Sequence, residues 1–324
     1  MAESNLETIS RRYRRFAKAE AAGSSPIYER LANAIADYEP ALRYIANLPP
    51  ERQQPNLLLA AVRWVAGLQP EPDRFFHALA EHEHAVRAVM LARTTQTNEP
   101  ARCAALLPVL ARLEQPLALI EVGASAGLCL FPDRYGYAYG SHTLSPKEPA
   151  AAPLFSCEVT GSVPLPAAMP RVIWRRGLDL NPLDARTGDA RRWLENLVWP
   201  EHSDRLAGLR AALALAAAEE PIVEAGNLLE DLPRLALQAP ADARLVVFHS
   251  AVVSYVADKT ARARFAETVK DLGGVWISNE VPGTFPAIAA KAGPQPLPGW
   301  FLLAVGGEPV AWTHPHGRAI QWIG

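Results

Sequence analysis

The sequence predicts an α/β fold, in which a helical N-terminal module precedes a parallel sheet that ends in an antiparallel hairpin. Over residues 1–115, apolar side chains recur at three- and four-residue spacing, which is typical of helices with one buried face. Over residues 116–324, short apolar runs alternate with helical patterns, as expected for a parallel sheet covered by helices on both faces. Near the C-terminus, Gly306-Gly307-Glu308-Pro309 separates two apolar runs and indicates the hairpin. We therefore expect two domains, 1–115 and 116–324.

Composition and charge argue against several classes of partner. A formal charge of −2 and a pI near 6.5 give no electrostatic reason to expect nucleic acid or an anionic membrane. The three cysteines, Cys103, Cys129 and Cys157, form no CxxC pair, which favours a reducing compartment over a disulfide framework or a zinc site. The N-terminus lacks the pattern of a signal peptide, and no apolar run has the length of a membrane span. We expect a cytoplasmic protein without a membrane partner.

In the N-terminal module, three polar features need an interpretation. Arginines at 11, 12, 14 and 15 form either a phosphate-binding patch or, in the favoured interpretation, the solvated face of a helix. In Glu81-His82-Glu83-His84 the histidines are two residues apart, so on a helix they point to different faces, and we predict no metal site. The uncharged run at 94–98, which ends at Glu99, is either a loop that caps the next helix or a polar loop beside a ligand.

The first predicted strand, 117–122, leads into a turn built of small residues. Its apolar run ends at Glu121, and the turn contains Gly123, Ala124, Ser125, Ala126 and Gly127. Two glycines let the backbone turn tightly and let a ligand approach it closely. A helix starting at this turn would offer unpaired N–H groups to a polar or anionic group. Taken alone, the pattern fits equally a ligand-binding turn and the tight turn of any α/β protein.

The next predicted strand ends at Gly177-Leu178-Asp179. An acid at this place commonly holds the ribose hydroxyls in nucleotide-binding α/β proteins, and Asp179 is the better candidate, with Asp184 second. The distance from Gly127 exceeds the roughly 20 residues of a compact unit. We therefore expect an insertion near 141–170, rich in proline and small residues, to be looped out, as an irregular segment or short hairpin that acts as a lid.

Three further predicted strands end at the same edge of the sheet, the one formed by the carboxyl ends of the parallel strands. A short strand leads into the turn Gly226-Asn227-Leu228, an apolar strand ends at His249-Ser250, and the next strand ends at Glu280. Open α/β sheets bind ligands at the carboxyl ends of their strands. His249 is a candidate general base or substrate-orienting group, and Glu280 can share its site. The alternative for His249 is a structural histidine whose nitrogens are both hydrogen-bonded.

The order of these motifs resembles that of class I S-adenosylmethionine-dependent methyltransferases over residues 100–324. The resemblance implies a Rossmann-like doubly wound sheet whose first motif is Glu121–Gly127, with Ser125 in place of the middle glycine. It also implies that the acceptor lies near His249 and Glu280. The residues it assigns to the cofactor S-adenosylmethionine are Glu121, Gly123, Ala124, Ser125, Gly127, Asp179, Asn227 and Leu228.

Over nearly its full length the chain also resembles an uncharacterised bacterial family. The motifs that carry this resemblance include Gln96-Thr-Asn-Glu99, Asp133-Arg134-Tyr135, Arg175–Pro182 and Val198-Trp-Pro200. It implies no particular reaction.

Three functions follow as expectations. The first is methyl transfer from S-adenosylmethionine to a small-molecule acceptor, for which the protein mainly supplies positioning and desolvation. The second is a non-catalytic protein that binds S-adenosylmethionine or another nucleotide. The third is an oxidoreductase that uses a dinucleotide, against which the missing middle glycine and the long gap between motifs argue. The acceptor and the oligomeric state are open.

Overall fold

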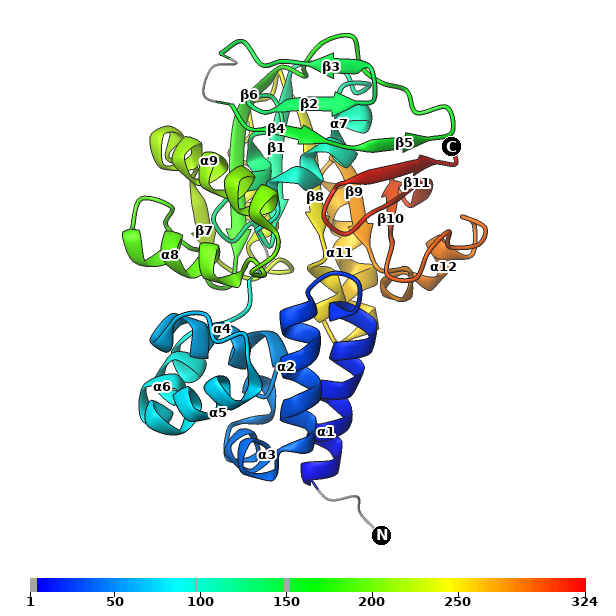
Figure 1. The fold of residues 1–324 in the computed structure, drawn as a ribbon. Helices are drawn as coiled ribbons and strands as arrows, with labels where there is room; N and C mark the ends of the chain where they lie inside the picture. Colours follow the sequence, from blue (N-terminus) through cyan, green and yellow to red (C-terminus); the bar gives the residue numbers. More distant parts are fainter. Residues whose placement is uncertain (1–4, 97, 149–151) are drawn as a thin grey trace. The chain divides into compact units, whose positions relative to one another are not determined.

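The protein was analysed as a computed structural model, which describes residues 5–96, 98–148 and 152–324. The chain forms two compact units (Figure 1). The first unit contains residues 1–97 and 192–206, and the second contains residues 98–191 and 207–324. These bounds differ from the domains expected at 1–115 and 116–324, because residues 98–115 group with the sheet and residues 192–206 group with the N-terminal helices. Thr97, which belongs to the polar run at 94–98, lies outside the described residues.

The first unit is built of helices, as the apolar spacing predicts. They are α1 (Asn5–Phe16), the π-helix η1 (Ala17–Ala21), α2 (Pro26–Asp37), α3 (Glu39–Ala46), the 3₁₀-helix η2 (Pro50–Arg52), α4 (Pro55–Ala66), α5 (Pro72–Glu81) and α6 (Glu83–Ala92). The arginines of α1 are exposed, while Ile9, Tyr13 and Phe16 are buried. This arrangement agrees with the interpretation of α1 as an amphipathic helix.

Residues 192–206 are attached to the first unit through the start of α2. Ser25 Oγ accepts a hydrogen bond from the backbone N–H of Tyr28 and donates one to Glu201 Oε2 at 2.6 Å. The ring of Trp199 lies 5.8 Å from that of Phe16 and 5.7 Å from that of Tyr28. Trp199 is therefore a packing residue of this unit. The segment includes the end of α8 (Gly188–Leu197) and the start of α9 (Ser203–Glu219).

The second unit contains a large, mostly parallel sheet of nine strands. Its order is β5-β12-β11-β10-β9-β8-β1-β6-β7. The bounds are β1 (Leu117–Val122), β5 (Glu158–Thr160), β6 (Val172–Asp179), β7 (Val223–Ala225), β8 (Arg244–Ser250), β9 (Val275–Glu280), β10 (Phe301–Val305), β11 (Glu308–Thr313) and β12 (Ala319–Trp322). Neighbouring strands from β7 to β9 are parallel, and β9 to β12 are antiparallel. The hairpin predicted at Gly306-Gly307 joins β10 to β11.

Helices and 3₁₀ turns connect these strands. They are η3 (Pro100–Arg102), α7 (Cys103–Leu110), η4 (Leu128–Leu130), α10 (Leu232–Ala236), η6 (Val253–Tyr255), α11 (Lys259–Asp271), η7 (Pro282–Thr284) and α12 (Pro286–Ala289). Phe265 and Val269 of α11 share one buried apolar cluster with Val247 of β8 and Trp276 of β9. This cluster fixes the strands whose carboxyl ends carry the predicted acceptor residues.

The segment after β1 is looped out of the main sheet, apart from its last strand. Strands β2 (Gly136–Tyr139), β3 (His142–Leu144) and β4 (Leu154–Ser156) form a separate sheet in the order β3-β2-β4. Strand β5 then pairs in parallel with β12, so the green and red segments of Figure 1 lie side by side. The insertion expected near 141–170 therefore contains short strands, and its residues 149–151 lie outside the described residues.

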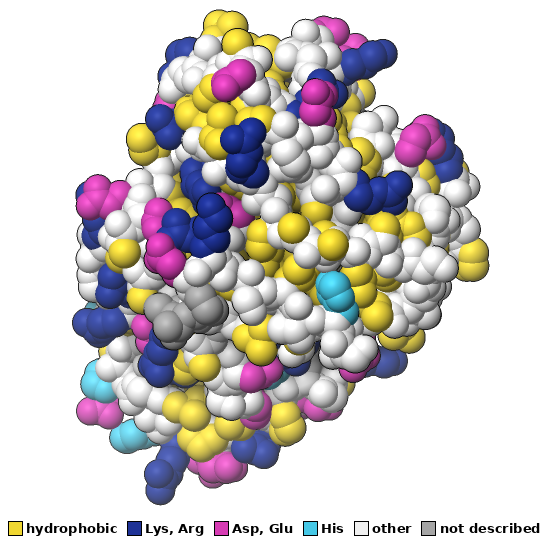
Figure 2. All heavy atoms as spheres, turned by 90° about the horizontal axis from the view of Figure 1, so that it is seen from above, with side chains coloured by type: hydrophobic (Ala, Val, Ile, Leu, Met, Phe, Trp, Pro, Cys, Tyr) yellow, Lys and Arg dark blue, Asp and Glu magenta, His cyan; other side chains and the backbone are white. Residues whose placement is uncertain are grey.

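The face of the molecule drawn in Figure 2 carries charges of both signs. Figure 2 shows one face of the molecule, on which basic and acidic side chains lie beside one another and apolar side chains gather near the middle. A face of mixed sign creates no field that would attract a polyanion. Within the part of the chain that the structure describes, no helix is both long and apolar enough to cross a membrane.

Candidate functional site

The turn after β1 is tightly folded around its two glycines. Gly123 has φ +73° and Gly127 has φ +70°, in the left-handed region that favours glycine. A Cβ atom on Gly123 would lie 2.2 Å from Cγ2 of Val252. Gly123 is therefore required by the close approach of the segment that follows β8, and this side of the turn is filled by protein.

Ser125 stands where the resemblance expects the middle glycine, and it adopts a glycine-like conformation with φ +50°. Three contacts hold it there: its N–H donates to Asp179 Oδ2 at 2.8 Å, its carbonyl accepts from Leu183 N at 3.0 Å, and its Oγ accepts from Asn98 Nδ2 at 2.7 Å. A non-glycine residue in this region is strained, and it persists where its surroundings fix it. The serine is therefore compatible with a well-defined turn.

The turn does not offer the unpaired N–H groups considered from the sequence. All five amides of residues 123–127 have acceptors within the protein: Leu178 O for Gly123 and Ala124, Asp179 Oδ2 for Ser125, Asn98 Oδ1 for Ala126, and Ala124 O for Gly127. The helix that follows is only the three-residue 3₁₀ turn η4. Residues 123–127 therefore offer no anion-binding helix N-terminus, because their amides are used in internal hydrogen bonds.

Asp179 lies at the carboxyl end of β6, beside this turn. Besides Ser125 N, it accepts a hydrogen bond from Asn181 N at Oδ1, at 2.7 Å. Each carboxylate oxygen has two acceptor sites, so the half-buried carboxylate keeps capacity for further donors. Asp184, the second candidate, is exposed and pairs with Arg186, whose hydrogen bonds lower the pKa of its carboxyl.

Asn98 is a site residue that sequence reasoning left undecided. Its side-chain amide donates to Ser125 Oγ and accepts from Ala126 N, so Asn98 helps to fix the turn together with Asp179. The feature of the sequence that points to Asn98 is the uncharged polar run at 94–98. Asn98 lies beside the turn after β1, and its contacts do not decide between a loop that caps the next helix and a polar loop beside a ligand.

Glu121 is buried beneath the turn. Burial raises the pKa of its carboxyl well above the usual value, and Cys129 and Asp179 raise it further, while Arg102 opposes them. Its Oε2 atom makes no hydrogen bond. Arg102 itself is held by two carbonyls, Pro315 O at 2.8 Å and Ser250 O at 3.0 Å. Burial of Glu121 therefore favours the protonated form of its carboxyl over the ionised form.

The turn after β7 is closed by its own hydrogen bonds. Asn227 is exposed; its Oδ1 accepts from Leu229 N at 2.8 Å, and its backbone N–H donates to Asp231 Oδ2 at 2.8 Å. Leu228 is half-buried between these residues. Both candidate cofactor residues therefore follow the edge strand β7, next to the strand that carries Asp179.

His249 and Glu280 are brought together, but in the interior. His249 is fully buried, and its Nδ1 lies 2.7 Å from Glu280 Oε1. The indole N–H of Trp276 donates to His249 Nε2 at 2.9 Å. Because that nitrogen accepts, the proton of the imidazole is on Nδ1 and is donated to Glu280. In this arrangement His249 has no nitrogen available to a substrate, so the expected role as a base would require breaking the bond to Trp276.

Glu280 also holds the segment that follows β8. Its Oε1 accepts hydrogen bonds from the backbone N–H groups of Val252 at 2.9 Å and Val253 at 3.0 Å. Burial by itself raises the pKa of Glu280, but the hydrogen bonds from His249, Val252 and Val253 outweigh it and lower the pKa below its usual value. Glu280 is thus an ionised carboxylate that fixes the loop closing over Gly123.

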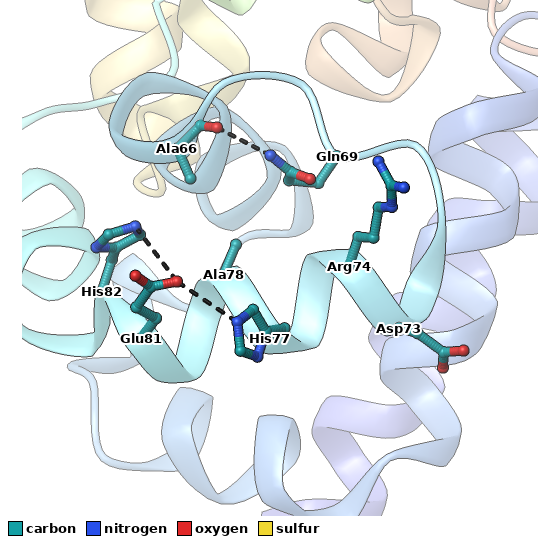
Figure 3. Close-up of a pocket in the computed structure, with 8 residues that line it drawn as sticks. All are labelled: Ala66, Gln69, Asp73, Arg74, His77, Ala78, Glu81 and His82. Carbon is teal, nitrogen blue, oxygen red and sulfur yellow. Dashed lines mark hydrogen bonds and ion pairs between the residues drawn. The ribbon is translucent and has the colours of Figure 1, made fainter.

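A separate hollow of about 490 Å³ lies on the first unit, between the end of α4 and α5 (Figure 3). His77 Nε2 lies 3.6 Å and His82 Nε2 4.0 Å from Glu81 Oε2. The side chains of His77 and Glu81 are exposed, and that of His82 is half-buried. In the described parts of the chain, no three His, Cys, Asp or Glu side chains are arranged to hold a metal ion.

Comparison with known proteins gives a family for the chain. The model of the family described as "Uncharacterized protein conserved in bacteria (DUF2332)" matches residues 10–322. No curated protein and no solved structure matches the sequence significantly. The family match spans both units and all the motifs discussed above. The chain therefore belongs to the uncharacterised bacterial family DUF2332.

Proposed function

We propose that the second unit binds S-adenosylmethionine at the carboxyl edge of its parallel strands and transfers the methyl group to a small-molecule acceptor. The strand order supports this proposal. Numbered along the chain, the parallel strands β7-β6-β1-β8-β9 follow the order third, second, first, fourth, fifth, which is that of a Rossmann-like doubly wound sheet. In such sheets ligands bind where the order reverses, which is here between β1 and β8.

The hydrogen bond between Asp179 and Ser125 carries the proposal. It keeps a half-buried carboxylate at the end of the second parallel strand, directly beside the turn after the first. In nucleotide-binding sheets an acid at this place accepts hydrogen bonds from the ribose hydroxyls. Asp179 retains acceptor sites for that purpose.

The backbone amides of the turn already have acceptors within the protein, and this determines which nucleotides the turn suits. A dinucleotide such as NAD carries a pyrophosphate, which requires unpaired N–H groups at the turn or at a helix N-terminus. Residues 123–127 provide none, since each amide is bonded within the protein. S-adenosylmethionine carries no phosphate, so the turn fits it better. Because Val252 fills one side of Gly123, the ligand would approach from the side of Asp179.

Bound S-adenosylmethionine would supply an electrophilic methyl group. The residues of this chain then orient the ribose, through Asp179, and fix the loop after β8, through Glu280 and His249. Transfer requires a general base only if the acceptor must lose a proton. Both ring nitrogens of His249 are hydrogen-bonded within the protein, so His249 is not free to act as a base. This favours an acceptor that needs no base. It also favours the second candidate function, a non-catalytic protein that binds S-adenosylmethionine.

Thermal unfolding of the full chain with added nucleotides tests the proposal. At about 100 times its dissociation constant, a ligand adds about 2.7 kcal/mol to the free energy of unfolding. We expect S-adenosylmethionine and S-adenosylhomocysteine to raise the melting temperature and NAD to leave it unchanged. If neither sulfur nucleoside raises it, the proposal is wrong. Production of S-adenosylhomocysteine in the presence of an acceptor would separate the catalyst from the binding protein.

A further inference from the structure

We infer that the acceptor half of this edge, formed by the loops after β8 and β9, takes an uncharged aromatic compound; as a statement about the acceptor, the inference rests on the proposed function. It rests on three observations: the few charged side chains that follow β8 and β9 are paired within the protein, nearby charges fix the two loops, and the loops expose an aromatic side chain.

The two halves of the carboxyl edge differ in charge. The segment between β8 and α11 and the segment between β9 and β10 together carry two charged side chains, Asp258 and Lys291. Asp258 accepts from the backbone N–H of Thr260 at the start of α11, and Lys291 pairs with Glu308. The shorter segments between β6 and α8 and between β7 and α10 carry four charged side chains, Asp184, Arg186, Glu230 and Asp231. A charged acceptor would therefore find no uncommitted opposite charge after β8 and β9, and burying an unpaired charge is costly.

Charged groups beside these loops fix them through backbone hydrogen bonds. Glu280 accepts from the amides of Val252 and Val253. Arg262 of α11 donates to the carbonyls of Val256 at 2.7 Å, Ser254 at 3.1 Å and Thr284 at 3.3 Å. Arg262 thereby ties the loop after β8 to the loop after β9. Because these charges bind the backbone, they set the position of the two loops and leave a neutral lining.

The side chains that the loops expose favour an aromatic ligand. Tyr255 is 83% exposed, and Val281 is 39% exposed. Phe285 is half-buried, with its ring 5.1 Å from that of Trp276 and nearly perpendicular to it. Aromatic side chains pair with aromatic ligands through stacked or edge-to-face contacts.

Calorimetric titration of the full chain with matched probes tests the inference. The probes are p-cresol, 4-methylbenzoate and 4-methylbenzylamine, which share a ring and a methyl group and differ in charge. We expect p-cresol to bind about tenfold more tightly than either ion, because neither ion finds a partner in the loops. We expect Tyr255→Ser to weaken p-cresol about two- to tenfold through the lost ring contact. Leu237→Ser, which changes an equally exposed apolar residue after α10, is the control and should leave binding unchanged.

The outcome for the acceptor is distinguishable from that for the cofactor. Equal affinity for p-cresol and the ions, no binding of p-cresol, or an unchanged affinity in Tyr255→Ser would each overturn the inference. Titration of the same samples with S-adenosylhomocysteine reports on the cofactor independently. Binding of p-cresol through Tyr255 without binding of S-adenosylhomocysteine would support the ligand class and contradict the proposed methyltransferase.

Discussion

Asp179 Oδ2 accepts a 2.8 Å hydrogen bond from the backbone N–H of Ser125, and this bond joins the end of β6 to the turn after β1. The same carboxylate accepts from Asn181 N. One acid therefore fixes two loops at the edge where the proposed cofactor binds. Its structural role and its proposed binding role have separate tests.

The structural role predicts a loss of stability in Asp179→Ala. Removing the carboxylate leaves the amides of Ser125 and Asn181 without their acceptor, at a cost of about 1–3 kcal/mol. Urea unfolding measures this change. Asp184→Ala is the control, since Asp184 is an exposed carboxylate of the same loop. Equal effects of the two substitutions would contradict the structural role.

The packing of Val252 on Gly123 predicts that Gly123→Ala lowers the stability and that a second substitution, at Val252, restores part of it. Gly123→Ala places a methyl group 2.2 Å from Val252 Cγ2 and also forces alanine into φ +73°. We expect it to reduce the free energy of unfolding by more than about 1 kcal/mol. Combining it with Val252→Ala removes the contacts with Cγ2 and Cγ1 at 2.2 and 2.6 Å but keeps the one with Cβ at 2.9 Å, so the double variant should recover most of the steric part and leave the backbone part. If Gly123→Ala alone leaves the free energy of unfolding unchanged, the loop after β8 does not pack on the turn.

The buried acid Glu121 predicts a stability difference that depends on pH. Because its pKa is raised in the folded protein, its contribution to stability is complete below the unfolded value of 4.5 and is lost as the pH rises through the folded value. The slope is about 1.4 kcal/mol per pH unit in that interval. Unfolding of Glu121→Gln and the wild type between pH 4 and 9 should therefore show the variant gaining relative stability with pH. A difference that stays constant with pH would contradict a raised pKa of Glu121 in the folded protein.

Glu280 predicts the opposite dependence. Its pKa is lowered in the folded protein, so its contribution is present above 4.5 and is lost as the pH falls through the folded value. Glu280→Gln should be less stable than the wild type at pH 7, and the difference should shrink below pH 4.5. Glu267→Gln on the exposed face of α11 controls for the removal of a surface carboxylate. A difference that persists at low pH would mean that Glu280 is not an ionised acceptor.

Much of the sheet follows from the sequence, because its strands carry local signals. The runs ending at Glu121, Asp179, His249 and Glu280 all form strands, and the glycine pair at 306–307 turns the hairpin. Asp179 and the turn of Gly123 were expected together on the basis of strand order. Their proximity is one consequence of parallel pairing between β1 and β6.

Other features depend on contacts that leave no local pattern. The burial of His249 between Trp276 and Glu280 cannot be distinguished in sequence from a histidine that faces a substrate. The occupied amides of the turn depend on Asn98 and Leu178, which are distant in sequence. Likewise, Trp199 and Glu201 join the N-terminal helices through tertiary contacts, so apolar spacing alone does not predict that residues 192–206 belong to the first unit.

The most direct test of the central claim is calorimetric titration of the full chain with S-adenosylhomocysteine. We expect the wild type and Asp184→Asn to bind it with the same affinity. We expect Asp179→Asn, which keeps the size of the side chain and removes its charge, to bind it at least about tenfold more weakly, since the ribose hydroxyls lose a carboxylate acceptor. Absence of binding to the wild type, or equal binding to Asp179→Asn, would contradict the proposal that this edge of the sheet holds S-adenosylmethionine.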